Sequence, residues 1–348
     1  MQGAQVYVDT QRLFESLPEA TKRGLSEIGI TSVNYEQMSQ LDAGKIFRQM
    51  VEMLGNSSHT ALTGMSVCMG IMLLCCMTEG FQVTLADRKL SRTANMVGTM
   101  SICTAIVVPL CSTIAGAVEV LNGAAGFMML YIPIMAGLLL SAGQEVTGTS
   151  YYTVMMTAGN AVSSVSAKFI SPLMNIFLAL TVMSSLSQKM NLKALCNSVY
   201  QFAKWVLTFV MAIFTGVMSL QTIVTSSMDH VSKKALRFAV SSFVPVVGGA
   251  LGEALNTFNG SLELLRSGAG VFVIIASAWI VLPSAAECIV WQFALFVLSS
   301  AGDFMGLSVM SGLFRSISKA VAMMTALLFC VMTVFIISTG MILMTGRG

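Results

Sequence analysis

Charged side chains are scarce in this chain. Only 10% of its 348 residues are Asp, Glu, Lys or Arg, whereas a soluble domain usually carries about 25%. With 55% hydrophobic residues and a mean hydropathy of +0.79, the chain has too little polar surface to cover a soluble globule of its size. The long apolar runs do not alternate with polar residues, which excludes a transmembrane barrel. The sequence therefore predicts an all-α, polytopic transmembrane helical bundle.

Histidine is almost absent too, because His59 and His230 are the only two. The chain also lacks the HExxH, GxSxG and Walker A motifs of metalloproteases, α/β-hydrolases and P-loop NTPases. None of the eight cysteines belongs to a group with zinc-ligand spacing, so we interpret them as buried, inert thiols. We expect no enzyme, no metal and no cofactor. The net charge of +3 is small and scattered, which argues against a nucleic-acid partner.

The first part of the chain, residues 1–58, differs from the rest. It holds seven acidic and five basic residues and no long apolar run, so we interpret it as a soluble or membrane-surface segment. A short helix is predicted to begin at Pro18 and Glu19 and to end near Gly29. The sequence shows no basic n-region followed by an apolar h-region, so no signal peptide is predicted. Residues 59–95 are predicted to form a first span and a basic loop.

Apolar runs fill the remainder. At about 20 residues per crossing they predict eight to ten membrane segments. The weakest are Tyr151–Lys168, which is rich in Ser, Gly and Thr, and Phe238–Leu255. The runs are Thr60–Glu79, Met96–Val118, Ala124–Ala142, Tyr151–Lys168, Ile170–Ser187, Trp205–Thr225, Phe238–Leu255, Gly268–Pro283, Ala285–Ser300 and Ala320–Thr345. The last of these corresponds to a C-terminal span at residues 320–345.

Basic residues cluster between the runs and predict an orientation. Loops on the cytoplasmic side carry an excess of Lys and Arg, which assigns Arg88–Arg92, Lys189–Lys204 and Arg315–Lys319 to that side. The N-terminal segment is then outside. The basic residues Lys233–Arg237 also fall outside if every run crosses the membrane. Either a neighbouring run is re-entrant, or this segment lies along the membrane interface.

Two stretches of the chain resemble each other. "YIPIMAGLLLSAGQEVTGTS" matches "FVPVVGGALGEALNTFNGSL" at a constant offset of 112 residues, which aligns Pro133 with Pro245. Two membrane repeat units are predicted, residues 96–190 and 203–302. Proline removes a helical hydrogen bond, and interrupted helices in corresponding positions of two halves indicate a central pathway. Pro133 and Pro245 are thus candidate conduit positions, and the GxxxG pair Gly248 and Gly252 is a candidate for close helix packing.

Four polar residues in or beside apolar runs are further candidates. Glu253 and Glu287 either line a water-filled path or lie at the membrane interface, because a carboxylate in hydrocarbon costs several kcal/mol. For Glu287 the surrounding apolar run favours burial. Gln221 and Asp229 belong to "SLQTIVTSSMDH", whose hydroxyl groups suggest a polar lining.

The segment Val217–Val271 resembles the stage III sporulation protein AE family of endospore-forming bacteria. The resemblance is dense and ungapped there and looser over most of the chain. It rests on Ser219, Gln221, Asp229, Arg237, Phe238, Phe243, Pro245, Gly248, Glu253 and Arg266.

The resemblance implies a role in endospore formation. The family works in the mother-cell membrane around the forespore, and members usually begin with a signal peptide. It implies as partners the other stage III A membrane proteins and the forespore stage II Q protein, which together form a trans-envelope channel or secretion-like complex. That complex supports late forespore gene expression, and the family supplies no catalytic residues.

From these observations the leading interpretation is a non-enzymatic component of a membrane channel complex. The lipid bilayer is expected to surround the protein. The sequence is also compatible with a homo-oligomer. The alternatives are a secondary transporter with a substrate site between the two repeats, and a purely structural anchor.

Overall fold

The fold is known from a computed structural model, which describes residues 13–32, 43–85, 88–141, 144–186, 194–217 and 248–344. Within these ranges every element is helical. The labelled elements are α2 (Glu19–Glu27), α4 (Ala43–Leu85), α5 (Arg88–Ser141), α6 (Glu145–Ser164), the π-helical turn η1 (Val165–Ile170), α7 (Ser171–Leu186), α9 (Gly248–Phe304) and α10 (Ser308–Met344). A further helix spans Ala194–Val217. The prediction of an all-α helical bundle is confirmed.

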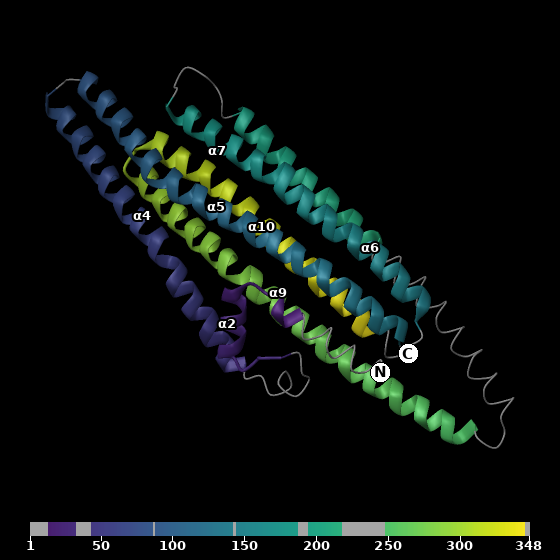
Figure 1. Cartoon of the computed structure of the whole chain (residues 1–348). Helices are drawn as coiled ribbons and strands as arrows, with labels where there is room; N and C mark the ends of the chain where they lie inside the picture. Colours follow the sequence, from purple (N-terminus) through teal and green to yellow (C-terminus); the bar gives the residue numbers. More distant parts are fainter. Residues whose placement is uncertain are drawn as a thin grey trace.

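The long helices run side by side along one axis and alternate in direction (Figure 1). α4 and α5 form one antiparallel pair, α6, η1 and α7 return as one nearly continuous rod, and α9 and α10 form a second hairpin. The short α2 packs near the start of α4, against α9. This arrangement satisfies the backbone hydrogen bonds within each helix, as a chain in hydrocarbon requires.

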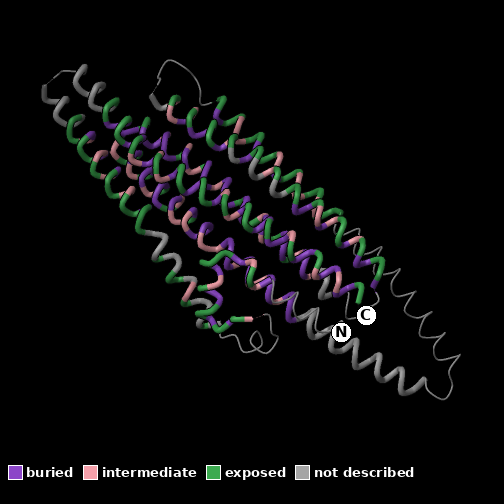
Figure 2. Tube along the Cα trace, viewed as in Figure 1, coloured by how far each residue is buried: buried purple, intermediate pink, exposed green. Residues whose placement is uncertain are grey.

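α9 is the central helix of the bundle. In the most apolar 18 residues of its stretch Gly268–Phe304, 72% are buried inside the protein, compared with 11% in the corresponding part of the peripheral helix Ala194–Val217. It contacts α4, α5 and α10, and Trp291 in its middle is fully buried. Figure 2 shows the same contrast, with buried residues concentrated along α5, α9 and α10. The side chains of α9 therefore set the spacing of the bundle.

Five helices in the described part of the chain are long and apolar enough to cross a membrane. This number is smaller than the eight to ten predicted for three reasons. Two pairs of predicted spans merge, Tyr151–Lys168 and Ile170–Ser187 form α6, η1 and α7, which are not among the five, and most of Phe238–Leu255 lies outside the described residues. Met96–Val118 and Ala124–Ala142 belong to α5, and Gly268–Pro283 and Ala285–Ser300 belong to α9. The apolar part of α5, Met96–Ser141, has 46 residues. At about 1.5 Å per residue it is roughly twice as long as the hydrocarbon core is thick.

The prolines have different local effects. Pro109 and Pro133 lie inside α5, and Pro283 lies inside α9, without ending either helix. Pro172 instead follows the π-helical turn Val165–Ile170. Its ring clashes with the carbonyl group four residues earlier, that of Lys168, which lies inside this turn. A π turn widens the helix locally and accommodates that loss.

The N-terminal segment joins the bundle. α2 begins after Pro18 and ends before Gly29, which has a φ of +91°, as the sequence predicts. α4 runs without a break from Ala43 to Leu85, so the boundary predicted at residue 58 lies inside one helix. The boundaries of the two repeat units, 96–190 and 203–302, stay a prediction, since much of the second unit's first half lies outside the described residues.

The three basic segments predicted as cytoplasmic loops lie toward one end of the bundle, but not all of them are loops. Arg88–Arg92 begins α5, Arg315–Lys319 lies inside α10, and part of Lys189–Lys204 belongs to the helix Ala194–Val217. The α4–α5 junction, the junction between α7 and the helix Ala194–Val217, and the α9–α10 turn share that end, and α2 lies toward the other (Figure 1). At the end of the bundle that holds the α9–α10 turn, Lys319 contacts Asn197, with 3.4 Å between Nζ and Oδ1. The segment Lys233–Arg237, which conflicted with the orientation rule, lies outside the described residues.

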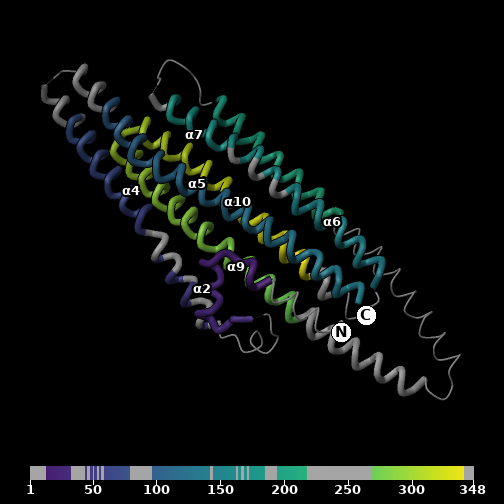
Figure 3. The backbone as a smooth tube through the Cα atoms, viewed as in Figure 1, coloured from purple at the N-terminus to yellow at the C-terminus, as the bar shows by residue number. Residues whose placement is uncertain are grey.

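Glycines allow two close helix approaches. A Cβ atom at Gly64 of α4 would lie 3.0 Å from the Trp291 ring of α9. A Cβ atom at Gly98 of α5 would overlap Cys75 Sγ of α4 and would lie 3.1 Å from Met310 Cε of α10. The chain trace is drawn as a continuous tube in Figure 3, in which α4 and α5 run together. Small residues allow such contacts because membrane helices associate mainly through close packing.

We predict that Gly98→Ala destabilises the bundle by about 1–3 kcal/mol, since the added methyl group overpacks the contact with Cys75. The matched control is Gly116→Ala in the same helix, which is exposed and has no atom within 4 Å of the added Cβ. The thermal unfolding midpoint in detergent measures both. Combining Gly98→Ala with Cys75→Ala restores part of the loss. Equal midpoints for the two glycine variants would contradict the close approach.

Candidate functional site

Polar side chains meet at the contact between α5 and α9. The Thr113 hydroxyl of α5 donates to the Glu287 carboxylate of α9 across 2.6 Å, and it also lies 3.2 Å from the Pro109 carbonyl oxygen. Thr113 is buried and Glu287 is half-buried. A carboxylate at such depth needs a partner. The geometry gives Glu287 one, and it ties α5 to α9 at a defined register.

A second polar contact joins α9 to α10. The Gln292 side-chain amide donates to Thr325 Oγ1 at 2.8 Å, and the Thr325 hydroxyl lies 3.0 Å from the Val321 carbonyl oxygen. Gln292 follows Glu287 by five residues on the same helix. α9 thus presents one polar group to α5 and another to α10.

Two buried tyrosines bind the far half of α10. Tyr131 of α5 lies 3.0 Å from Thr339, and Tyr151 of α6 lies 2.8 Å from Ser338, in each case between hydroxyl oxygens. All four residues are buried. Adjacent hydroxyl groups of α10 thus hold two different helices, because buried polar groups require hydrogen-bond partners.

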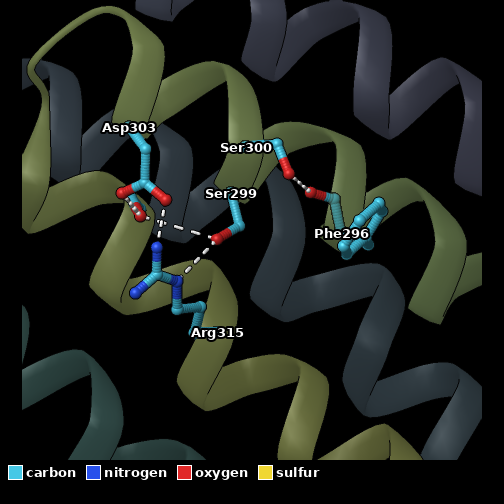
Figure 4. Close-up of polar contacts among 6 residues, drawn as sticks. Phe296, Ser299, Ser300, Asp303 and Arg315 are labelled. Carbon is cyan, nitrogen blue, oxygen red and sulfur yellow. Dashed lines mark hydrogen bonds and ion pairs between the residues drawn. The ribbon is translucent and has the colours of Figure 1, made fainter.

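The α9–α10 turn carries a charged network (Figure 4). Arg315 forms an ion pair with Asp303 and donates from Nε to Ser299 Oγ at 3.1 Å. Ser311 donates to the other Asp303 oxygen at 2.5 Å. Gly306 has a φ of +78°, and Leu307 N–H bonds the Gly302 carbonyl at 2.8 Å, the pattern of a helix end closed by a left-handed residue.

The tightness of that turn depends on Gly302. A Cβ atom there would lie 3.1 Å from Ser311 Cβ and 3.3 Å from Met72 Cε. Asp303 and Arg315 remain partly exposed, so their ion pair contributes little to stability. It orients the loop at the end of the bundle that carries the basic junctions.

The structure places the predicted site residues in different regions. Pro133 lies on the exposed side of α5, away from the polar contacts, and Glu287 lies at the α5–α9 contact. Gly248, Gly252 and Glu253 belong to the first turns of α9, where only the backbone is described. Gln221, Asp229 and Pro245 lie outside the described residues. Conduit roles for these positions stay predictions.

The sequence reasoning missed the residues that the structure brings together. They are Thr113, Tyr131, Tyr151, Gln292, Thr325, Ser338 and Thr339. Most of them are single polar side chains within apolar runs, whereas Tyr151 lies in a stretch rich in Ser, Gly and Thr, and Ser338 and Thr339 are adjacent. A lone polar side chain in an apolar run could have suggested a bond between helices. A hydroxyl group can, however, also bond the carbonyl four residues earlier in its own helix. Pairing between helices therefore requires the tertiary structure.

The chemistry of these contacts is structural. The described residues contain no group of three His, Cys, Asp or Glu side chains able to hold a metal ion. None of the eight cysteines, all of which lie in the described part of the chain, forms a disulfide, and five of them are buried. The prediction of buried thiols therefore holds for most cysteines, whereas Cys111 is exposed on α5. The polar contacts fix the register between helices.

We predict that Thr113→Val lowers the stability of the bundle by about 1 kcal/mol, because the Glu287 carboxylate loses its donor. Thr181→Val is the matched control, since Thr181 is also buried and its hydroxyl has no hydrogen-bond partner among the described residues. The unfolding midpoint in detergent should fall for the first variant and stay constant or rise for the second. A fall of equal size in both would remove the Thr113–Glu287 bond as the explanation.

Comparisons with known proteins point to one family. The family model for stage III sporulation protein AE matches residues 30–346. Stage III sporulation protein AE of Bacillus subtilis (strain 168) is 23% identical over 235 residues, which cover 66% of this chain and 58% of that protein. The match thus spans less than two thirds of this relative. No solved structure matches the chain. Because the family model covers nearly the whole length, the chain belongs to the stage III sporulation protein AE family.

Proposed function

We propose that this protein is a non-enzymatic membrane component of the channel or secretion-like complex that joins mother cell and forespore. The family match carries the sporulation role. Five helices long and apolar enough to cross a membrane support a multi-pass membrane location. The finer assignment, to the mother-cell membrane around the forespore and to late forespore gene expression, follows the family resemblance.

The packing of the bundle supports a scaffold within a complex. The central helix α9 is hydrogen-bonded to α5 through Glu287 and to α10 through Gln292. The peripheral helix Ala194–Val217 is mostly exposed, with Phe202, Trp205 and Phe209 among its exposed side chains. A rigid core with a large outer surface suits assembly with other membrane proteins and with lipid. The partners proposed are the other stage III A membrane proteins and the stage II Q protein.

We predict that affinity purification of the tagged protein from sporulating cells recovers other stage III A membrane proteins and the stage II Q protein. The same tag on an unrelated multi-pass membrane protein, expressed in the same cells, is the control. Recovery of the tagged chain without any other sporulation protein contradicts the proposal.

The competing function is a secondary transporter with its substrate site between the two repeat units. A transporter moves a defined solute when reconstituted alone in liposomes, whereas a component of a larger complex acts only with its partners. Solute uptake by the purified protein alone would therefore favour the transporter.

A further inference from the structure

Two buried tryptophans of α9 carry indole N–H groups without a hydrogen-bond partner among the described residues. Trp279 is 3% exposed and Trp291 is fully buried, and the Nε1 atom of each has no acceptor within that part of the chain. An indole N–H can only donate, and a buried donor that has left water without finding an acceptor lowers stability. Buried tryptophans usually have a partner for this group. These two donors therefore require an acceptor from outside the described chain.

The two tryptophans lie on the same ridge of α9 as Glu287. Trp279, Pro283, Glu287 and Trp291 follow one another at intervals of four residues, and we name these four residues the α9 ridge. Side chains at this spacing are neighbours on a helix surface. Helical side chains also point back toward the N-terminus, so the Trp291 ring extends over the turn that holds Glu287. The α9 ridge thus places an indole donor on each side of a carboxylate.

The α9 ridge also carries more acceptors than the described protein groups supply with donors. Thr113 of α5 is the one side chain in the described ranges that donates to Glu287, and it reaches Oε1 across 2.6 Å. No basic side chain in that part of the chain forms an ion pair with this carboxylate. Pro283 has no N–H, so it cannot donate to the Trp279 carbonyl four residues earlier. Donors and acceptors without protein partners therefore alternate along one ridge.

The middle of the α9 ridge is less tightly covered than its two ends. Pro283 and Glu287 are half-buried, whereas Trp279 and Trp291 are buried. The far edge of the Trp291 ring is held by α4, because a Cβ atom at Gly64 would lie 3.0 Å from Trp291 Cη2. Packing against α4 and the bond to Thr113 therefore hold the polar groups in place, and a molecule of the size of water reaches the ridge at Glu287.

We propose that the α9 ridge is a water-binding site inside the bundle. Bound water molecules accept hydrogen bonds from the indoles of Trp279 and Trp291, and they donate to the Glu287 carboxylate and to the Trp279 carbonyl. Water fits this set of groups because each molecule both accepts and donates, whereas a metal cation is repelled by the two N–H groups. The water also hydrates a carboxylate that has no cation partner among the described residues. The site follows from contacts within one chain and does not depend on the role in sporulation.

The indole signals of the tryptophans test this site directly. The chain has three tryptophans, so isotope-labelled tryptophan in the full-length protein, held in lipid nanodiscs, gives three indole N–H signals by NMR. Single Trp→Phe variants assign them, and Trp205 on the peripheral helix is the third. We expect direct magnetisation transfer from water to the indoles of Trp279 and Trp291. Absence of this transfer at one of these two indoles, or at both, overturns the site.

A substitution at the centre of the α9 ridge tests the part played by the carboxylate. Glu287→Leu removes the acceptor beside Trp291, so we expect the transfer from water to the Trp291 indole to be lost. Ile289→Leu is the matched control, because Ile289 is in the same turn of α9 but is 44% exposed and lies outside the ridge. Unchanged transfer to Trp291 in Glu287→Leu, or an equal loss in Ile289→Leu, contradicts a water site centred on Glu287.

A measurement on the unchanged chain keeps the test valid if the variants do not fold. Brief X-ray irradiation in water labelled with a heavy oxygen isotope produces hydroxyl radicals from bound water, and these radicals oxidise the nearest side chains. We expect the heavy isotope in Trp279 and Trp291, and none in Phe335, which is fully buried and packs against Phe127. Unlabelled tryptophans of the ridge overturn the site. Equal labelling of Phe335 also overturns it, because water would then reach the core in general.

Discussion

The packing of α9 between α4, α5 and α10 is the constraint on which the rest of the structure depends. In hydrocarbon, helices gain little from burying apolar surface against one another, because lipid is equally apolar. Association then relies on close contact and on hydrogen bonds between helices. α9 uses both, through the Gly64–Trp291 contact with α4 and through the bonds of Glu287 and Gln292. α5 and α10 are consequently held to one central helix.

The polar contacts also explain how long, uniformly apolar helices keep one register. A helix such as α10 could slide along its neighbours with little change in apolar contact. Bonds from Thr325 near its middle and from Ser338 and Thr339 near its end fix its position relative to α9, α6 and α5. The charged α9–α10 turn fixes the other end. α10 is thus attached to its neighbours at three points along its length: the α9–α10 turn, Thr325, and the pair Ser338 and Thr339. Each attachment is specific because its partner is a single side chain.

The outer surface divides into regions of different polarity. α7 and the helix Ala194–Val217 expose large apolar side chains, as a lipid-facing surface does. α6 exposes hydroxyl, amide and carboxylate groups, with Val146 and Tyr152 as exposed apolar residues between them. The π turn before Pro172 separates the two regions.

The low charge and the apolar runs were sufficient to predict the helical membrane class. Local chemistry was also sufficient for α2, where Pro18 and Gly29 mark the ends, because such signals act within one turn of chain. The number of separate helices was not predictable, since the residues around Glu119 and Asn122 are compatible with a loop and with the continuous helix α5. The interpretation of Tyr151–Lys168 as a weak span likewise could not show which side of α6 is polar outward.

Among the site residues, Glu287 was recognisable as a carboxylate in an apolar run, but its partner was not. Thr113 is 174 residues away in the chain, and no local pattern distinguishes it from Thr181, which is equally buried and has no hydrogen-bond partner among the described residues. Composition and hydropathy thus determined the solvent of this protein and its helical class, because both depend on side chains one at a time. Which polar groups face each other, and which face water, was decided only by the tertiary structure, because that depends on how distant helices are rotated and aligned.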